Sequence, residues 1–115
     1  MDGQCELESQ LMRLDETNDD DAYYIAARLE DFFENGPSNS MQVFRWDDDD
    51  QNNPAQVFEI KEARFRIFGF QHPNDQNGFI LTHLWKKRKS YPEQSKEFEK
   101  ARSIRDKYLP LLKRK

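Results

Sequence analysis

Basic side chains gather in two short segments in the second half of the chain. The first segment carries Lys61, Arg64 and Arg66, and the second is the run Lys86, Lys87, Arg88 and Lys89. Immediately after this run, Ser90 and Glu93 have capping-box spacing around Tyr91-Pro92, which predicts the start of a helix. A helix N-terminus presents free backbone N–H groups and the positive end of a dipole, so this neighbourhood is suited to binding a phosphate.

Cleavage of RNA is one reaction that such groups can support. Attack of a ribose 2′-hydroxyl on the adjacent phosphate needs a proton acceptor, a proton donor and cations that stabilise the charge on the phosphorane. Arg and Lys supply the cations, and a Lys or a Tyr can exchange the protons. The structural alternatives are a solvated turn at residues 86–89, a cross-strand ion pair between Arg66 and Glu59, and a packing role for Tyr91.

Charge is divided unevenly along the 115 residues. Residues 1–60 carry 16 Asp and Glu against three Lys and Arg, whereas residues 61–115 carry 15 Lys and Arg against six Asp and Glu. The overall charge of -4 therefore conceals a basic half, and it does not exclude a nucleic-acid partner. Mutual attraction of the two halves is the alternative reading.

The apolar pattern predicts a small single α+β domain. Helical spacing indicates a helix at residues 22–34, which Asn35, Gly36 and Pro37 end, and a C-terminal helix from about Tyr91 to Pro110, followed by a basic tail at 110–115. Strand-like segments occupy residues 42–46, 56–61, 64–71 and 79–85, which predicts a four-stranded antiparallel meander packed against the N-terminal helix. The apolar residues of segment 1–20 fit both helical and strand spacing. A fifth strand at residues 4–11 and a helix there are therefore both open possibilities.

The shortest link predicts how the central strands pair. If Glu62-Ala63 forms a two-residue hairpin turn, Lys61 stands opposite Arg64 and Glu59 opposite Arg66. One face of the sheet is then apolar and the other charged. The apolar face would carry Phe58, Ile60, Phe65 and Ile67.

An acidic loop, residues 47–50, consists of four consecutive Asp residues. Like charges repel and gain little by folding onto a core, which predicts a solvated connector at the end of the sheet opposite Lys61 and Arg64. Competition with RNA for the basic residues is the alternative.

Other chemistry finds little support. Cys5 is the only cysteine, which excludes an intramolecular disulfide, and His72 and His83 match no common zinc spacing, so neither a metal nor another cofactor is expected. His83 lies in an apolar strand and is predicted to be structural. Trp46 and Trp85 are predicted to lie in the core or on a sheet face, although either can stack a base. No segment resembles a signal peptide or a membrane span, which predicts a soluble, cytoplasmic protein.

The second half of the chain resembles a known family. The similarity covers residues 56–108 and rests on ordered segments: Val57-Phe-Glu-Ile-Lys61, Arg64-Phe-Arg-Ile-Phe-Gly-Phe70, Phe79-Ile-Leu-Thr-His-Leu-Trp-Lys-Lys-Arg-Lys89 and a charged helix opening at Tyr91-Pro92. These segments resemble the RelE/HigB superfamily of toxins from bacterial type II toxin–antitoxin systems. The resemblance implies helices covering one face of an antiparallel sheet, and ribosome-dependent mRNA cleavage without metal. It also implies neutralisation by a cognate antitoxin, for example of the helix-turn-helix type.

The resemblance also implies roles for individual residues. Lys61, Arg66, Lys87 and Tyr91 correspond to catalytic positions, with Arg66 expected at the scissile phosphate and Arg88 as the alternative to Lys87. The expected RNA-binding residues are Arg64, Lys86, Arg88 and Lys89.

Two features depart from the family pattern. Glu59 stands where some members have a basic residue, and the acidic loop would repel ribosomal RNA if it lay beside the basic residues. A non-catalytic module of the same fold, which binds nucleic acid or an acidic protein, is therefore the main alternative to an endoribonuclease. A phage-derived or mobile-element protein whose acidic half is the working surface is a further one.

Overall fold

The computed structural model describes residues 10, 19–38, 40, 42–87 and 94–112. In these segments, helix α2 (Asp19–Asn35) is followed by strand β1 (Phe44–Trp46), a 3-10 turn η1 (Asp48–Asp50) and strand β2 (Val57–Glu62). Strands β3 (Phe65–Gln71) and β4 (Phe79–Lys86) and helix α3 (Gln94–Leu112) complete the fold. The predicted α+β class and the four-stranded antiparallel meander, in the order β1-β2-β3-β4, are confirmed.

Local sequence explains the helix ends. α2 includes Asp19, three residues before the predicted start. The negative charges of Asp20 and Asp21 suit the positive end of the helix dipole. It ends where Gly36 adopts a positive φ of 75° and donates its N–H to the carbonyl of Phe32 at 2.8 Å. Pro110 does not end α3, which continues to Leu112.

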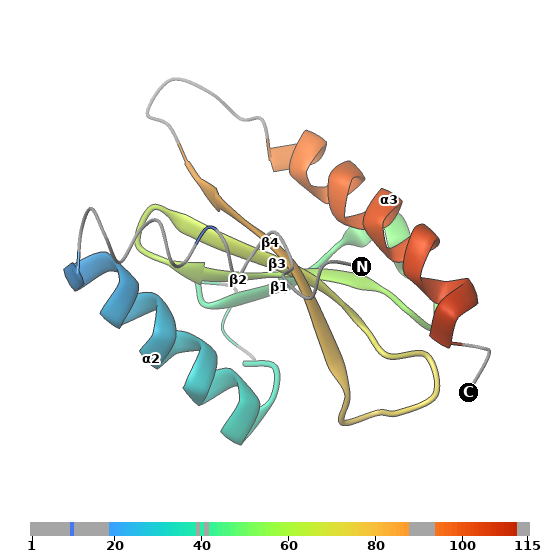
Figure 1. The fold of residues 1–115 in the computed structure, drawn as a ribbon, viewed down its shortest axis with the longest axis horizontal. Coiled ribbons are helices and arrows are strands. Elements are labelled where there is room, and N and C mark those ends of the chain that lie inside the picture. Colours follow the sequence, from blue (N-terminus) through green and yellow to red (C-terminus); the bar gives the residue numbers. More distant parts are fainter. Residues whose placement is uncertain (1–9, 11–18, 39, 41, 88–93, 113–115) are drawn as a thin grey trace.

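The two helices cover opposite faces of the sheet, as Figure 1 shows. On one face, Ile25 and Phe32 of α2 pack against apolar residues that include Phe58, Ile60 and Ile67. On the other face, Phe98 and Ala101 of α3 pack against Val57, Phe68 and Phe70. The predictions of helices on one face and of a single apolar face are therefore wrong, because strands β2 and β3 bury side chains on both sides.

The pairing of β2 with β3 also differs from the prediction. Lys61 pairs with Arg66 and Glu59 pairs with Phe68, so the turn is Ala63-Arg64 rather than Glu62-Ala63. Ala63 takes a positive φ of 52° in this turn. The predicted grouping of Phe58, Ile60, Phe65 and Ile67 on one face is nevertheless correct.

The outer edge of β4 meets a side chain from the N-terminal segment. The Gln10 amide donates to the Leu84 carbonyl at 2.8 Å and accepts from the Leu84 N–H at 2.7 Å. Of the proposed fifth strand at residues 4–11, Gln10 is the residue that the structure describes, and the other positions lie outside the described residues.

At Gly69, where the register shifts between β3 and β4, the neighbouring strand lies close to the position of a Cβ. A Cβ here would lie 2.5 Å from the Ile80 carbonyl oxygen and 2.8 Å from Cζ of Phe58. The carbonyl belongs to the neighbouring strand and cannot withdraw without disturbing the pairing. We therefore expect Gly69→Ala to destabilise the fold by about 1–3 kcal/mol, measured by urea unfolding. A variant as stable as the wild type would contradict this close contact.

Candidate functional site

Cations from two parts of the chain converge at one end of the sheet, as the sequence predicts. Lys61 stands opposite Arg66, Phe65 stands opposite Lys86, and the N–H of Lys87 donates to the Arg64 carbonyl at 2.7 Å. The turn between β2 and β3 therefore lies beside the end of β4. We call this group the basic end; its members are Lys61, Arg64, Arg66, Lys86 and Lys87.

Arg66 is anchored on the turn itself. Its Nη1 donates to the carbonyls of Ala63 at 2.8 Å and Phe65 at 2.9 Å, and it makes no ion pair among the described residues. The expected alternative, an ion pair with Glu59, is therefore wrong, because Glu59 lies opposite Phe68. The half-buried guanidinium keeps its positive charge available to an anion.

Lys61 is a partly enclosed cation of the basic end, and it forms an ion pair. Its Nζ lies 3.8 Å from Oε1 of Glu59, and its side chain is 20% exposed while that of Glu59 is 0% exposed. The lysine side chain thus pairs with a buried carboxylate while remaining partly accessible to solvent.

The remaining described cations of the basic end are exposed. Arg64 lies in the turn, and Lys87 follows β4 directly. Lys86 lies with its Nζ 5.7 Å from the centre of the Phe65 ring, on the face that α2 covers. The basic end therefore presents charge on both sides of the sheet. Arg88, Lys89 and Tyr91, the other predicted site residues, lie outside the described residues.

The surroundings of His83 resemble those of a catalytic histidine. Its ring is fully buried and stacks on Phe68, with Nδ1 2.9 Å from Oγ1 of Thr82 and Nε2 3.2 Å from Oε1 of Glu97. A histidine held by a carboxylate can act as a general base, but this ring has no exposed surface that a substrate could reach. His83 is thus a buried side chain with both ring nitrogens partnered, as its place in an apolar strand predicts.

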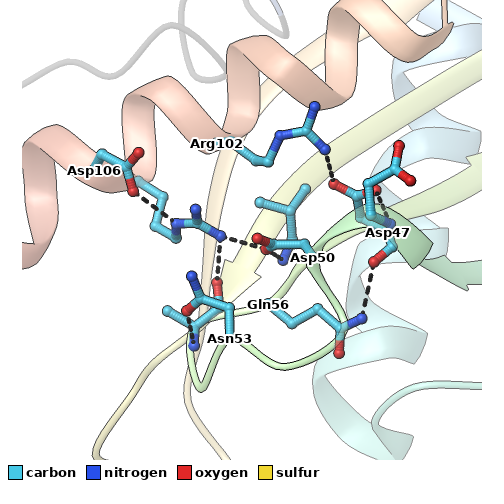
Figure 2. A network of polar contacts seen from close by, with 10 residues as sticks. Asp47, Asp50, Asn53, Gln56, Arg102 and Asp106 are labelled. Atoms are coloured by element: carbon cyan, nitrogen blue, oxygen red, sulfur yellow. Dashed lines mark hydrogen bonds and ion pairs between the residues drawn. The ribbon is translucent and has the colours of Figure 1, made fainter.

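The acidic loop is not the solvated connector that the sequence predicts. Asp47 and Asp50 are buried, whereas Asp48 and Asp49 are exposed. The Asp47 carboxylate accepts a hydrogen bond from Arg102 of α3. Asp50 accepts one from Arg105 and another, at 2.9 Å, from the N–H of Val57 (Figure 2).

Arg105 also donates to the Ala55 carbonyl at 3.2 Å and, through Nε, to Oδ1 of the exposed Asp106 at 3.1 Å. Sequence reasoning missed both ion pairs, although a signal was present. Asp47 and Asp50 are three residues apart in the chain, as are Arg102 and Arg105 on one side of a helix. The loop lies at the Val57 end of β2, away from Lys61, as predicted.

Trp46 and Trp85 each pack beside one of the two cores, in line with the structural prediction for both. Within the described segments, no three His, Cys, Asp or Glu residues form a group that could hold a metal ion. Nor does any helix in these segments have the length and apolar character needed to cross a membrane.

The basic end, the buried histidine and the Asp–Arg network thus occupy different positions around one sheet. Of these three groups in the described part of the chain, the basic end is the one that combines exposed charge with the Lys and Arg side chains that can bind a phosphate. Comparison of the chain with family models, with curated proteins and with solved structures gives no match.

Proposed function

We propose that this protein is a metal-independent endoribonuclease that cleaves mRNA on the ribosome, in the manner of the RelE/HigB toxins that its sequence resembles. The observation that carries the proposal is the convergence of Lys61, Arg66 and Lys87 at the end of the sheet, with Arg64 and Lys86 beside them. The half-buried Arg66 has no carboxylate partner among the described residues, so its charge is available to a phosphate.

In the proposed reaction, the ribose 2′-oxygen attacks the adjacent phosphorus and the bond to the 5′-oxygen breaks. The products are a 2′,3′-cyclic phosphate and a 5′-hydroxyl end. Arg66 and Lys87 hold the phosphate, and Arg64 and Lys86, with Arg88 and Lys89, bind the flanking RNA backbone. The resemblance assigns proton transfer to Tyr91.

Induced expression in bacteria tests the proposal. We expect growth to stop and ribosome-bound mRNA to acquire new ends that carry a 5′-hydroxyl, because attack by the 2′-oxygen leaves that group on the downstream fragment. Mapping of 5′ ends with a ligase specific for 5′-hydroxyl RNA measures this result. RNA crosslinking without new ends would instead support the non-catalytic binding module.

We further propose a cognate antitoxin as the cytoplasmic partner. The basic end attracts an acidic protein segment, which would compete directly with RNA. Pull-down from the native host should recover a small protein encoded beside this gene. Recovery of ribosomal RNA alone, without cleavage, would argue against the toxin–antitoxin assignment.

A further inference from the structure

Trp85 lies beside Arg66 on the face of the sheet that α3 covers. The two residues stand directly opposite each other on strands β3 and β4, and both side chains are half-buried. Paired residues on neighbouring strands project to the same face, with their Cβ atoms about 4.5–5.5 Å apart. An aromatic ring therefore stands next to the cation expected at the scissile phosphate.

The pair lies one row closer to the basic end than the residues on which α3 packs. Phe68 and His83 form the inner row, and the Phe98 ring of α3 meets Phe68 edge-on with ring centres 5.2 Å apart. Two residues further along each strand, Arg66 and Trp85 follow on the same face. Trp85 packs against the edge of this core, but the core does not enclose it, since part of its side chain reaches solvent.

The rings of the two tryptophans have different surroundings. Trp46, on the face that α2 covers, meets Phe44 and Phe58 edge-on with ring centres 5.1 and 5.8 Å away. Within the described residues, Trp85 makes no ring contact and no cation lies over its ring. The neighbouring Arg66 guanidinium donates to backbone carbonyls instead. Trp85 is thus an accessible indole whose stacking capacity the described fold does not use.

A half-exposed aromatic ring beside phosphate-binding cations is the combination with which proteins bind single-stranded nucleic acid, because every base has a π-face. We propose that Trp85 is a base-stacking residue of the basic end: it stacks the base of the nucleotide whose phosphate Arg66 binds. The substrate is then a single strand, since a base inside a duplex offers no free face to an indole. Stacking accepts all four bases, so this contact adds affinity without a sequence preference.

The inference rests on the proposed function, from which it takes RNA as the ligand of the basic end. Tryptophan fluorescence tests the contact directly, because the chain contains two tryptophans. In Trp46→Phe the emission comes from Trp85 alone, and in Trp85→Phe it comes from Trp46 alone. The probe is a short single-stranded oligoribonucleotide with 2′-O-methyl riboses, in which the 2′-oxygen cannot attack.

We expect the oligonucleotide to quench the emission of Trp46→Phe in a saturable manner, because the base stacks on Trp85. The emission of Trp85→Phe should stay unchanged, since Trp46 lies on the opposite face of the sheet. Binding of the oligonucleotide, measured by its fluorescence anisotropy, without quenching of Trp85 overturns the inference. Absence of binding at low salt overturns it as well.

A second probe separates the base from the phosphate. An oligomer of equal length that keeps the sugar–phosphate backbone but lacks the bases still presents its charges to the basic end. This oligomer should leave the emission of Trp46→Phe unchanged. Equal quenching by the two oligomers would show that Trp85 responds to the phosphates and not to a base, and it would overturn the inference.

The affinity of the base-carrying oligonucleotide gives an independent measurement. Trp85→Leu keeps apolar bulk against the core but removes the stacking surface, and we expect it to weaken binding about 5-fold to 150-fold. The slope of log affinity against log salt concentration should equal that of the wild type, because stacking involves no charge. Arg66→Ala, in contrast, should reduce this slope by about one unit, since it removes a phosphate contact.

Wild-type affinity in Trp85→Leu, or a flattened salt dependence, overturns the inference. If Trp85→Leu fails to fold, the fluorescence of Trp46→Phe decides, because that variant leaves Trp85 in place. The two proposals fail separately. Base-dependent quenching in a protein that cleaves no mRNA refutes the endoribonuclease alone, whereas mRNA cleavage without base-dependent quenching refutes the stacking contact alone.

Discussion

Arg66→Ala is expected to reduce the proposed RNA cleavage about a hundredfold or more. Arg66 is the cation expected at the scissile phosphate, and removing one group that stabilises a transition-state oxyanion typically costs a factor of about 100 to 1,000 in rate. The guanidinium also donates to the carbonyls of Ala63 in the turn and Phe65 in β3, so its position is fixed before RNA binds. The rate of appearance of 5′-hydroxyl ends, compared between variant and wild type, measures the effect.

The control is Lys107→Ala, which removes the same charge from the exposed surface of α3. Lys107 follows Arg105, whose partner Asp50 lies at the opposite end of the sheet from the basic end. We expect its cleavage rate to stay within about twofold of the wild type, because it lies outside the site. The melting temperature of Arg66→Ala should fall by only a few degrees, since half-exposed positions contribute little to stability. Equal cleavage by Arg66→Ala and wild type would refute the role of Arg66.

Asp50→Ala is expected to lower the free energy of unfolding by about 3–5 kcal/mol. The substitution removes the buried carboxylate partner of Arg105, which keeps only the exposed Asp106 carboxylate at 3.1 Å, and it leaves the N–H of Val57 without the Asp50 acceptor. Both losses are costly inside a protein, because a buried unpaired charge or donor cannot be compensated by water. Urea unfolding at neutral pH measures the change.

The same acidic loop provides the control. Asp48 and Asp49 are neighbouring aspartates that remain exposed, so Asp48→Ala and Asp49→Ala should change stability by no more than about 0.5 kcal/mol. If all three alanine variants unfold alike, the buried ion pair contributes nothing to stability. Comparison of Arg105→Met with the double variant Asp50→Ala/Arg105→Met separates the energy of the pair from the cost of an unpaired partner.

The strands could be predicted because Phe, Ile and Val are concentrated in them, between segments rich in Asp, Asn, Pro and Gly. The register of the β2–β3 pairing could not be predicted. Moving the turn from Glu62-Ala63 to Ala63-Arg64 shifts the pairing by two residues, and a two-residue shift leaves every side chain on the same face. The apolar pattern is therefore the same for both registers, although only one of them places Lys61 opposite Arg66.

The second buried face was missed for a related reason. Glu59, Lys61 and Arg66 gave that side of the sheet a charged character, which masked the contribution of Val57, Phe68 and Phe70. Charged residues near one end of a strand are compatible with a core near its other end. The Asp47–Arg102 and Asp50–Arg105 pairs were missed because their members are 55 residues apart. The matching three-residue spacing within each segment does not by itself show that the two segments meet.

The Gln10 amide on the edge of β4 has a consequence for self-association. A side-chain amide offers the same donor and acceptor as a peptide group, so at Leu84 it takes the place that a strand of another chain would occupy. Long apolar edge strands are templates for intermolecular sheet growth, and β4 carries Ile80, Leu81 and Leu84. Gln10 therefore occupies the backbone hydrogen-bonding groups of Leu84 and hinders addition of a foreign strand at this position of the edge.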